Sequence, residues 1–350
     1  MERYIIKFSE AGINDVAEVG SKNVSLGEMY NNLTPKGLLI PDGFAITAAA
    51  FRLFLQYNTL NESLRQLMER LDHTEFSNLN AIGIAARKLI MDAKFPRGPE
   101  QEITEAYAVL LTAKNNDVAV RSSAFSMGFM HLFPEGLHES YLNIRGPLAL
   151  IYAIKCCYAS LYSNRAIKFR ETYGITHDSV VLSITIQRMV RADTGCSGIG
   201  YTSHSFPGFS DVVRLTGNWG LGQNTPMETW DEYIIPKPFQ KTKHSSIKTI
   251  GSKSRMTVYK DISAGTNSTL TLITAPELRE KPVLDDAGVF ELAGQAVLLE
   301  TYFGHPVEFK WARDGENSRF YILGVRPVNK EIYRDAATNH LSLPKGKDIA

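Results

Sequence analysis

The sequence predicts an α+β protein of two lobes, with a helical N-terminal part followed by mixed or antiparallel sheets. Its 350 residues exceed one ordinary core, because compact domains mostly contain about 100–150 residues. Helical patterns are concentrated in the first third of the chain, at 47–57, 60–70, 78–93 and 100–113. A β-hairpin is predicted near the end, where Pro306–Ala312 and Arg319–Val325 flank a turn that contains Gly and Asn.

The composition limits the function classes. The chain is 44% hydrophobic and 21% charged with a formal net charge of +1, and a general nucleic-acid binder would carry a basic excess. Charges occupy the first positions, where a signal peptide would begin its apolar core, and no apolar run is long enough to span a membrane. Cys156, Cys157 and Cys196 lack metal-ligand spacing, and adjacent cysteines rarely form a structural disulfide. A reducing, cytoplasmic setting is therefore expected.

Near the N-terminus, the stretch 19–29 reads VGSKNVSLGEM and predicts a glycine turn that opens a helix. Main-chain amides at such a turn, together with the ammonium group of Lys22, are able to hold phosphate oxygens. A solvated surface lysine is the competing interpretation of Lys22. The stretch 40–47 then reads as a turn, a short strand and an N-cap, Thr47, for the next helix.

In the middle of the chain, Arg121 is expected to emerge from a short buried strand, Asp117–Ser123. A loop with four bulky apolar residues is predicted at 124–136, and Pro147 is expected to start one long helix that stops before Gly174. Further strands are predicted at 139–144, 179–190, 197–202, 211–215 and 231–235. The sequence also predicts a glycine-rich bend at 219–223, a solvated basic loop or ribbon at 237–255, and a helix at 286–302 that stops at Gly304.

The terminal hairpin carries charged side chains in a regular pattern. Since side chains alternate across a strand, Glu308 and Lys310 project from one face, and Phe309 and Trp311 from the other. The second arm is mostly apolar and ends with Arg326 just before a proline. A cation at the end of a buried strand needs an anion, so the arm is either a salt-bridged sheet edge or part of an anion site.

Together these segments resemble, in the same order, the N-terminal ATP-binding domain of the phosphoenolpyruvate synthase (pyruvate, water dikinase) and pyruvate phosphate dikinase family, a domain shared with rifampicin phosphotransferases. The matching segments are 19–29, 40–47, 118–123, 156–170, 187–190, 197–202 and 302–327. The resemblance implies an ATP-grasp-like, two-lobed nucleotide-binding fold, with one lobe at 1–187, a second at 188–328 and a tail at 329–350. It also implies transfer of a phosphoryl group from ATP to a carrier histidine, and from there to pyruvate.

The resemblance also implies site residues. Lys22, Arg121 and Arg326 match the cations that contact the phosphates, which is reasonable because phosphoryl transfer mostly needs charge neutralisation and alignment. The hinge that receives adenine matches 187–190, with Gln187, Met189 and Val190 as cofactor-binding residues. Gly136 matches a glycine of the lid over the phosphates, and Gln223 stands in the glycine-rich bend.

This chain departs from the family pattern at the metal site. The family reads Asp-Ile-Glu-Trp where this chain has Glu308-Phe309-Lys310-Trp311, so a lysine takes the place of a Mg²⁺ ligand. Gly324 replaces a glutamine on the second arm, and Gln223 replaces a glutamate. Glu308 is left as a weak metal candidate, and loss of a hard oxygen ligand weakens a magnesium site.

Three functions stay open on the sequence. One is the ATP-binding part of a phosphoenolpyruvate synthase-like dikinase, truncated and impaired, whose partner is a histidine-carrier domain in a downstream or separate chain. Another is a catalytically dead nucleotide-binding module, which Lys310 and Gly324 favour. The third is the ATP domain of a rifampicin-type antibiotic phosphotransferase. All three require ATP, and none requires nucleic acid or a membrane.

Overall fold

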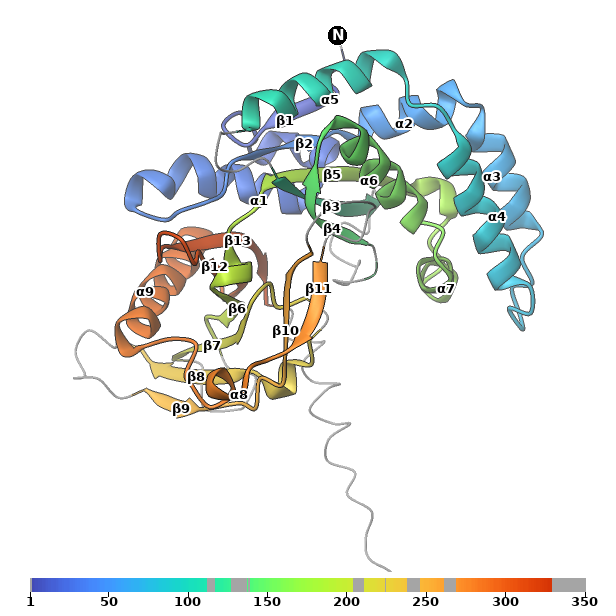
Figure 1. Cartoon of the computed structure of the whole chain (residues 1–350). Coiled ribbons are helices and arrows are strands. Elements are labelled where there is room, and N and C mark those ends of the chain that lie inside the picture. The colour runs from blue at the N-terminus through green and yellow to red at the C-terminus, as the bar shows by residue number, and fades with distance from the viewer. Residues whose placement is uncertain are drawn as a thin grey trace, which may run out of the picture. The chain divides into compact units, whose positions relative to one another are not determined.

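The computed structural model describes residues 2–111, 117–126, 137, 139–203, 211–223, 225–237, 246–260 and 269–328. The chain divides into two compact units (Figure 1). The first comprises Met1–Arg191 with Val258–Leu270, and the second comprises Ala192–Thr257 with Thr271–Ala350. Each unit contains helices and one large sheet whose neighbouring strands run antiparallel. The predicted α+β class is confirmed.

The first unit is built on a five-stranded sheet in the order β1-β2-β5-β3-β4. Its strands are β1 (Ile5–Lys7), β2 (Gly43–Ile46), β3 (Asp117–Ser126), β4 (Ser140–Arg145) and β5 (Val180–Arg188). Leu182, Ile184 and Ile186 of β5 join the main hydrophobic core on one face. Ser183 and Thr185 project from the other face, because successive side chains of a strand alternate.

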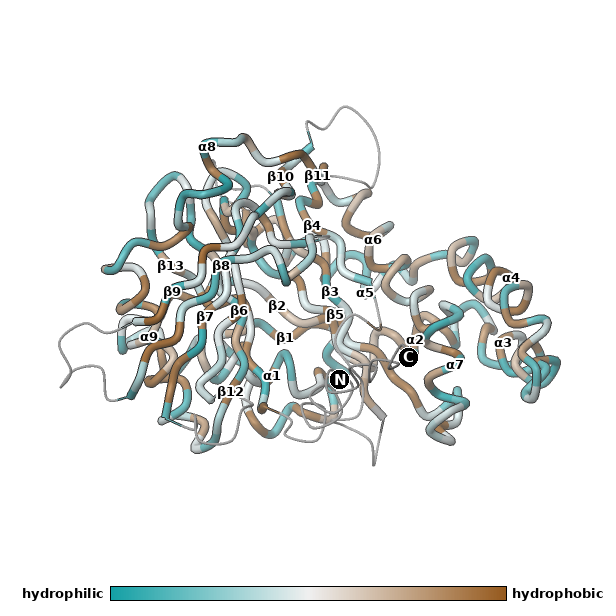
Figure 2. Tube along the Cα trace, turned by 90° about the horizontal axis from the view of Figure 1, so that it is seen from below, coloured by the Kyte–Doolittle hydropathy of each residue, from teal (hydrophilic) through white to brown (hydrophobic). Residues whose placement is uncertain are grey.

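Helices cover both faces of this sheet. They are α1 (Val16–Asn32), α2 (Ala48–Tyr57), α3 (Leu60–Glu69), α4 (Leu79–Asp92), α5 (Arg97–Leu110), α6 (Pro147–Ser160) and α7 (Asn164–Thr172). α1 lies on the Ser183 face, where Asn23 bonds both β5 hydroxyls. α2 to α7 contribute to the main core on the opposite face. Figure 2 shows hydrophilic and hydrophobic residues alternating along α3 and α4, as expected for amphipathic helices.

Most of the predicted helices of this unit are confirmed as α2, α3 and α4, and Thr47 caps α2 by accepting a hydrogen bond from the Ala50 amide at 3.4 Å. Two predictions are wrong in detail. α5 begins at Arg97, because Pro99 falls in the first turn, where a missing N–H costs nothing. The helix from Pro147 ends at Ser160, and Ser163 starts α7 by accepting the Ala166 N–H at 3.1 Å.

The strand predicted at 117–123 continues to Ser126, so the first three residues of the predicted loop, 124–126, belong to the strand instead. The continuation follows from its pairing with β5, in which Phe125 lies opposite Val181. The rest of that predicted loop, 127–136, lies outside the described residues.

The second unit contains a six-stranded sheet in the order β13-β12-β6-β7-β8-β9. Trp311 and Phe309 of β12 are almost fully buried, and α9 contributes the buried Leu292 and Leu299. Gly304 ends α9 with φ 71°, which confirms the predicted stop. The strands are β6 (Cys196–Tyr201), β7 (Val212–Trp219), β8 (Asp231–Pro236), β9 (Ile247–Thr249), β12 (Val307–Arg313) and β13 (Phe320–Pro327); the helices are α8 (Pro276–Arg279) and α9 (Asp286–Phe303); β10 (Arg255–Tyr259) and β11 (Thr269–Ile273) form a separate two-stranded sheet.

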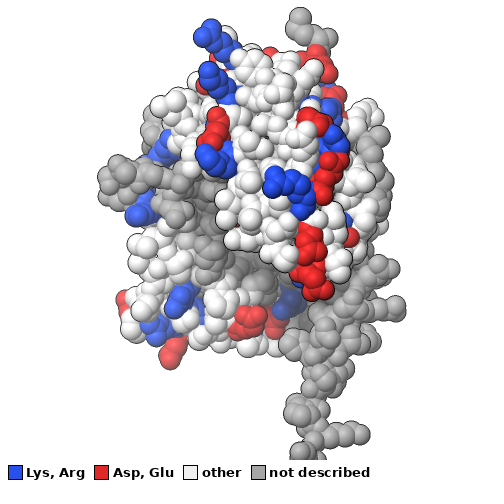
Figure 3. Space-filling view, turned by 90° about the vertical axis from the view of Figure 1, so that its right-hand side faces the viewer, with Lys and Arg blue, Asp and Glu red and all other residues white. Residues whose placement is uncertain are grey.

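Surface charge in the described residues is mixed. On the face shown in Figure 3, basic and acidic side chains lie interspersed among uncharged ones. Within the described ranges, no helix has both the length and the hydrophobicity to cross a bilayer.

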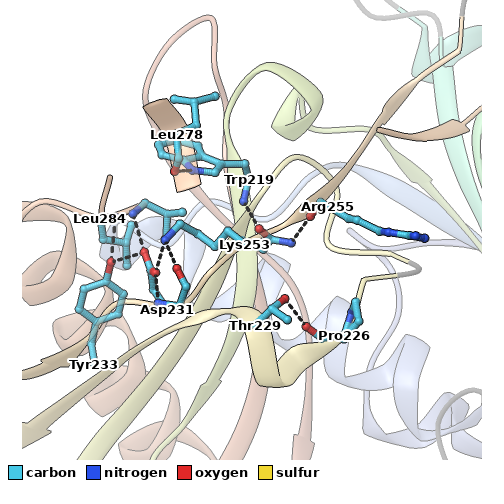
Figure 4. A network of polar contacts seen from close by, with 12 residues as sticks. Trp219, Pro226, Thr229, Asp231, Tyr233, Lys253, Arg255, Leu278 and Leu284 are labelled. Atoms are coloured by element: carbon cyan, nitrogen blue, oxygen red, sulfur yellow. Dashed lines mark hydrogen bonds and ion pairs between the residues drawn. The ribbon is translucent and has the colours of Figure 1, made fainter. Parts of the chain in front are cut away.

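One basic segment differs from its predicted role. The stretch 237–255 is expected to be solvated, yet Lys253 is fully buried. Its ammonium group donates to Asp231 Oδ1 at 2.5 Å and to the Gly251 carbonyl at 2.9 Å (Figure 4). Asp231 also accepts from the amides of Gly251 and Val283, each at 2.8 Å. A buried lysine must be paired, and this pairing fastens the segment before β10 to β8.

Candidate functional site

The predicted phosphate turn has the backbone geometry that its sequence indicates. α1 is interrupted at Gly20, with φ 72° and ψ 165°, and helical structure resumes at Ser21. Lys22, in the first turn after the interruption, is half-buried rather than fully solvated. A Cβ atom at Gly20 would lie 2.9 Å from the Phe125 ring and 3.0 Å from Ser123 Oγ. Only glycine fits both this φ and this close approach to β3.

Arg121 projects from the same face of the sheet as the Gly20 turn. It lies opposite Thr185 in the β3–β5 ladder, and directly opposite residues of an antiparallel pair share a face. Its Nη1 atom donates to Gln187 Oε1 at 3.4 Å, and Gln187 Nε2 donates to the Pro41 carbonyl at 3.3 Å. The buried Gln187 side chain therefore connects Arg121 to the segment before β2.

The predicted adenine hinge, 187–190, comprises the last two residues of β5 and the two residues after it. The Arg188 amide donates to the Asp42 carbonyl at 2.9 Å, and the Met189 amide donates to the Asp117 carbonyl at 3.1 Å. Met189 and Val190 are buried. Two of the hinge amides thus already have partners within the first unit, and the predicted roles of Gln187, Met189 and Val190 toward adenine stay predictions.

In the second unit, the predicted glycine-rich bend follows β7. Gly220 and Gly222 adopt positive φ angles of 76° and 66°, which glycine tolerates best. The Leu221 amide donates to the Thr257 carbonyl at 2.8 Å, and the Thr257 hydroxyl donates to the Gln223 carbonyl. These bonds fasten the bend that carries Gln223 to the start of β10.

The terminal hairpin is confirmed as β12 and β13, and its register pairs Glu308 with Arg326 and Lys310 with Gly324. Arg326 Nε and Nη2 donate to the two Glu308 carboxylate oxygens at 3.0 and 2.8 Å. The Glu308 side chain is 5% exposed and that of Arg326 is 43% exposed. β13 is the edge strand of its sheet, so the salt-bridged edge is present, and Glu308 is the anion that the sequence requires.

The residues of the hairpin do not fit a magnesium ion. Both oxygens of Glu308 are engaged by Arg326, and Lys310 stands two residues away on the same strand. Magnesium prefers several hard oxygen ligands. Within the described ranges, no group of three or more His, Cys, Asp or Glu side chains is placed to hold a metal ion.

Gly136 and the three cysteines are the remaining residues with a predicted role or property. Gly136 lies outside the described residues. The cysteines are free, and burial raises the pKa of both Cys156 and Cys157. A thiol reacts and binds metals as its thiolate, so a buried thiol with a raised pKa is a poor nucleophile and a poor metal ligand.

Sequence reasoning missed the polar residues behind the Gly20 turn. Asn23, Ser183 and Thr185 are fully buried and bonded to one another. An asparagine inside a helical pattern is a weak signal, because its side chain competes with the helix backbone for hydrogen bonds. Nothing in the local pattern indicates that its partners lie more than 150 residues away, as the separation of 160 positions between Asn23 and Ser183 requires.

The chain is similar to known proteins over most of its length. The family described as "Pyruvate phosphate dikinase, AMP/ATP-binding domain" matches residues 16–343. The chain is 37% identical over 332 residues to the phosphoenolpyruvate synthase of Pseudomonas aeruginosa, covering 93% of this chain and 42% of that protein. The Escherichia coli phosphoenolpyruvate synthase is 36% identical over 351 residues, covering 99% and 44%.

A more distant relative extends the same pattern. The probable phosphoenolpyruvate synthase of Methanocaldococcus jannaschii is 32% identical over 332 residues, covering 93% of this chain and 27% of that protein. The chain thus spans less than half the length of the curated relatives that it matches. Since the family match covers nearly the whole chain, this protein belongs to the pyruvate phosphate dikinase family as its AMP/ATP-binding domain.

Proposed function

We propose that this chain is the ATP-binding part of a phosphoenolpyruvate synthase-like dikinase, and that it delivers a phosphoryl group from ATP to a carrier histidine outside the chain. The observation that carries the proposal is the Gly20 turn. Backbone amides at a helix start, with a lysine in the first turn, suit the phosphates of a nucleotide. The relatives named phosphoenolpyruvate synthase supply the substrate class.

In this proposal each predicted residue has a distinct task. Lys22, Arg121 and Arg326 each neutralise phosphate charge. The segment with Met189 and Val190 receives the adenine, while Gly136 and Gln223 belong to the segments around the phosphates. Binding follows an ATP-grasp arrangement with lobes at 1–187 and 188–328 and a tail at 329–350. The three free cysteines favour a reducing, cytoplasmic setting.

The terminal hairpin favours a second candidate, a nucleotide-binding module without turnover. Glu308 is held by Arg326 on two hydrogen bonds, and Lys310 stands across from Gly324, where a glycine offers no polar side chain. ATP binding would then persist while magnesium-dependent transfer is lost. A rifampicin-type phosphotransferase shares the ATP-binding part, and no described residue favours it over the dikinase.

Thermal unfolding with and without Mg·ATP tests the proposal. Ligand at one hundred times its dissociation constant adds about 2.7 kcal/mol of stability, which raises the melting temperature measurably. Lys22→Ala is expected to reduce that rise. Arg326→Ala is expected to do the same, and the Arg52→Ala variant, altered at an exposed residue of α2, serves as the control. Absence of any shift at millimolar ATP would contradict the proposal.

A further inference from the structure

A hydrogen-bonded network lies directly behind the candidate phosphate turn. Asn23 Nδ2 donates to the Val19 carbonyl at 2.9 Å and to Ser183 Oγ at 2.7 Å. Ser183 Oγ donates to the same Val19 carbonyl at 2.8 Å, and Thr185 Oγ1 donates to Asn23 Oδ1 at 2.7 Å. All three side chains are 0% exposed. Every member has a partner, and such complete networks make a buried region rigid.

The network holds the chain at the residue before the interruption in α1. Val19 precedes Gly20, whose φ of 72° turns the backbone before helical structure resumes. Two side-chain donors converge on the Val19 carbonyl. The direction in which the following segment leaves, and with it the position of Lys22, therefore depends on these donors.

The same network sets the turn relative to Arg121. Ser183 and Thr185 lie on β5 opposite Ser123 and Arg121 of β3. Since opposite residues of the ladder share a face, the two hydroxyls that hold Asn23 are neighbours of the strand positions that carry Arg121 and that contact Gly20. One strand thus fixes both candidate phosphate-binding elements of the first unit.

We infer that Asn23, Ser183 and Thr185 are positioning residues, which hold the Gly20 turn so that the Lys22 segment is aligned with Arg121 on the phosphate end of a bound nucleotide. This inference rests on the proposed function. The network touches no nucleotide; it acts through the turn. Its loss is expected to weaken recognition of phosphate and to leave recognition of the nucleoside unchanged.

The test compares two Thr→Val substitutions at fully buried threonines. Thr185→Val removes the donor to Asn23 and preserves side-chain shape. Thr47→Val removes a hydroxyl that donates to the Arg3 carbonyl at 2.8 Å and caps α2, away from the turn. One hydrogen bond of this kind corresponds to a loss of about three- to ten-fold in affinity. We expect Thr185→Val to weaken ATP binding by this factor, with adenosine affinity unchanged, and Thr185→Ser to restore ATP affinity.

The control variant should lower the melting temperature without changing the ratio of ATP to adenosine affinity. An equal loss for both ligands in Thr185→Val, or no loss for either, would overturn the inference. If the unaltered chain binds no ATP, the proposed function fails, and hydrogen exchange then decides the inference. Amides 21–24 should exchange faster in Thr185→Val than in Thr47→Val, and equal exchange in the two variants would overturn it.

Discussion

At the turn before Lys22, Gly20 combines a positive φ with close contact to β3. The positive φ and the close contact each disfavour a side chain at this position, and each destabilises a substituted protein by its own amount. Gly20 has φ 72° and ψ 165°, a backbone conformation that is almost restricted to glycine and costs another residue about 1–3 kcal/mol. A Cβ atom at 2.9 Å from the Phe125 ring adds a steric penalty, because packed interiors yield only partially.

Gly20→Ala is therefore expected to lower the free energy of unfolding by about 2–6 kcal/mol, as the sum of strain and overpacking. Gly146→Ala is the matched control, since Gly146 has nearly the same backbone conformation, φ 83° and ψ 154°, but an added Cβ meets nothing within 4 Å. Chemical denaturation of both variants checks this. Equal losses in the two variants would mean that contact with Phe125 and Ser123 contributes nothing.

His177 is held between a cation and a carboxylate. Arg170 Nε donates to its Nδ1 at 2.8 Å, and its Nε2 lies 2.9 Å from Glu171 Oε1. Burial, followed by the positive charge of Arg170, lowers the pKa of His177 to about 4, although Glu171 and Asp178 oppose the shift. His73 also contacts Glu171, at 2.7 Å. The folded protein therefore keeps His177 neutral at pH values where the unfolded chain protonates it.

The sign of the pH dependence follows. The pKa of His177 in the folded protein lies below its ordinary value of about 6.5 in the unfolded chain. The stabilisation from neutral His177 is therefore complete above about pH 6.5 and is lost as the pH falls toward the folded pKa. Between about pH 7 and pH 5 we expect unfolding free energy to drop by roughly 2 kcal/mol from this group. Urea denaturation at several pH values measures the slope, and His177→Gln should flatten it. An unchanged slope in that variant would assign the effect to other groups.

Among the elements, the loop before β10 depends on one buried ion pair. Lys253 and Asp231 are both 0% exposed and lie 2.5 Å apart. Removing one partner of such a pair leaves a buried charge, which typically costs about 3–5 kcal/mol.

Lys253→Met is expected to lower stability by an amount in that range. The matched control is Lys248→Met, because Lys248 pairs with the largely exposed Asp286, and exposed pairs contribute about 0–1 kcal/mol. Denaturant midpoints of the two variants make the comparison. Similar small losses for both would show that Asp231 is satisfied by its other donors, the Gly251 and Val283 amides and the Tyr233 hydroxyl.

The hairpin β12–β13 contains two of the three positions, Lys310 and Gly324, at which the sequence departs from the pattern that its resemblance implies. Lys310 and Gly324 are directly opposite, so the two replaced positions form one pair. Two unit charges about 4 Å apart interact by roughly 4 kcal/mol at an effective dielectric of 20, and a divalent ion would be repelled more strongly. If Lys310 points toward the bound nucleotide, ATP binding by the unaltered chain is expected to be independent of magnesium.

Lys310→Glu combined with Gly324→Gln is expected to bring magnesium dependence to ATP binding. Space exists for the new glutamine, since a Cβ at Gly324 meets nothing within 4 Å. ATP titrations with magnesium and with chelator, on both proteins, measure the effect. An unaltered chain that already needs magnesium as strongly as the double variant would point to Glu308 or another acid as the ligand.

At the scale of the whole molecule, the chain represents only part of its relatives. It covers 42% of the Pseudomonas aeruginosa protein and 44% of the Escherichia coli protein. In the proposed function, the carrier histidine and the pyruvate site lie outside the residues of this chain. The purified chain is therefore expected to form no phosphoenolpyruvate from pyruvate and ATP, as measured by a coupled assay. Formation of the product by this chain alone would require both sites within its own residues.

The sequence by itself determined the features that depend on neighbouring residues. The α2–α4 helices, the Gly304 stop and the terminal hairpin follow from local periodicity, capping and turn chemistry. The positive φ of Gly20 is of the same kind. The break between α6 and α7 carried a local signal as well, the capping Ser163, which the longer helical pattern outweighed.

Only the tertiary structure decided which distant side chains meet. Asn23 bonds Ser183 across 160 positions of sequence, and Lys253 is buried against Asp231. Glu308 accepts two hydrogen bonds from Arg326 of the neighbouring strand. Such pairings depend on strand order and register, which result from the burial of the whole core. A lysine or an asparagine reads the same in the sequence whether it is solvated or buried, and its partner determines which state has the lower free energy.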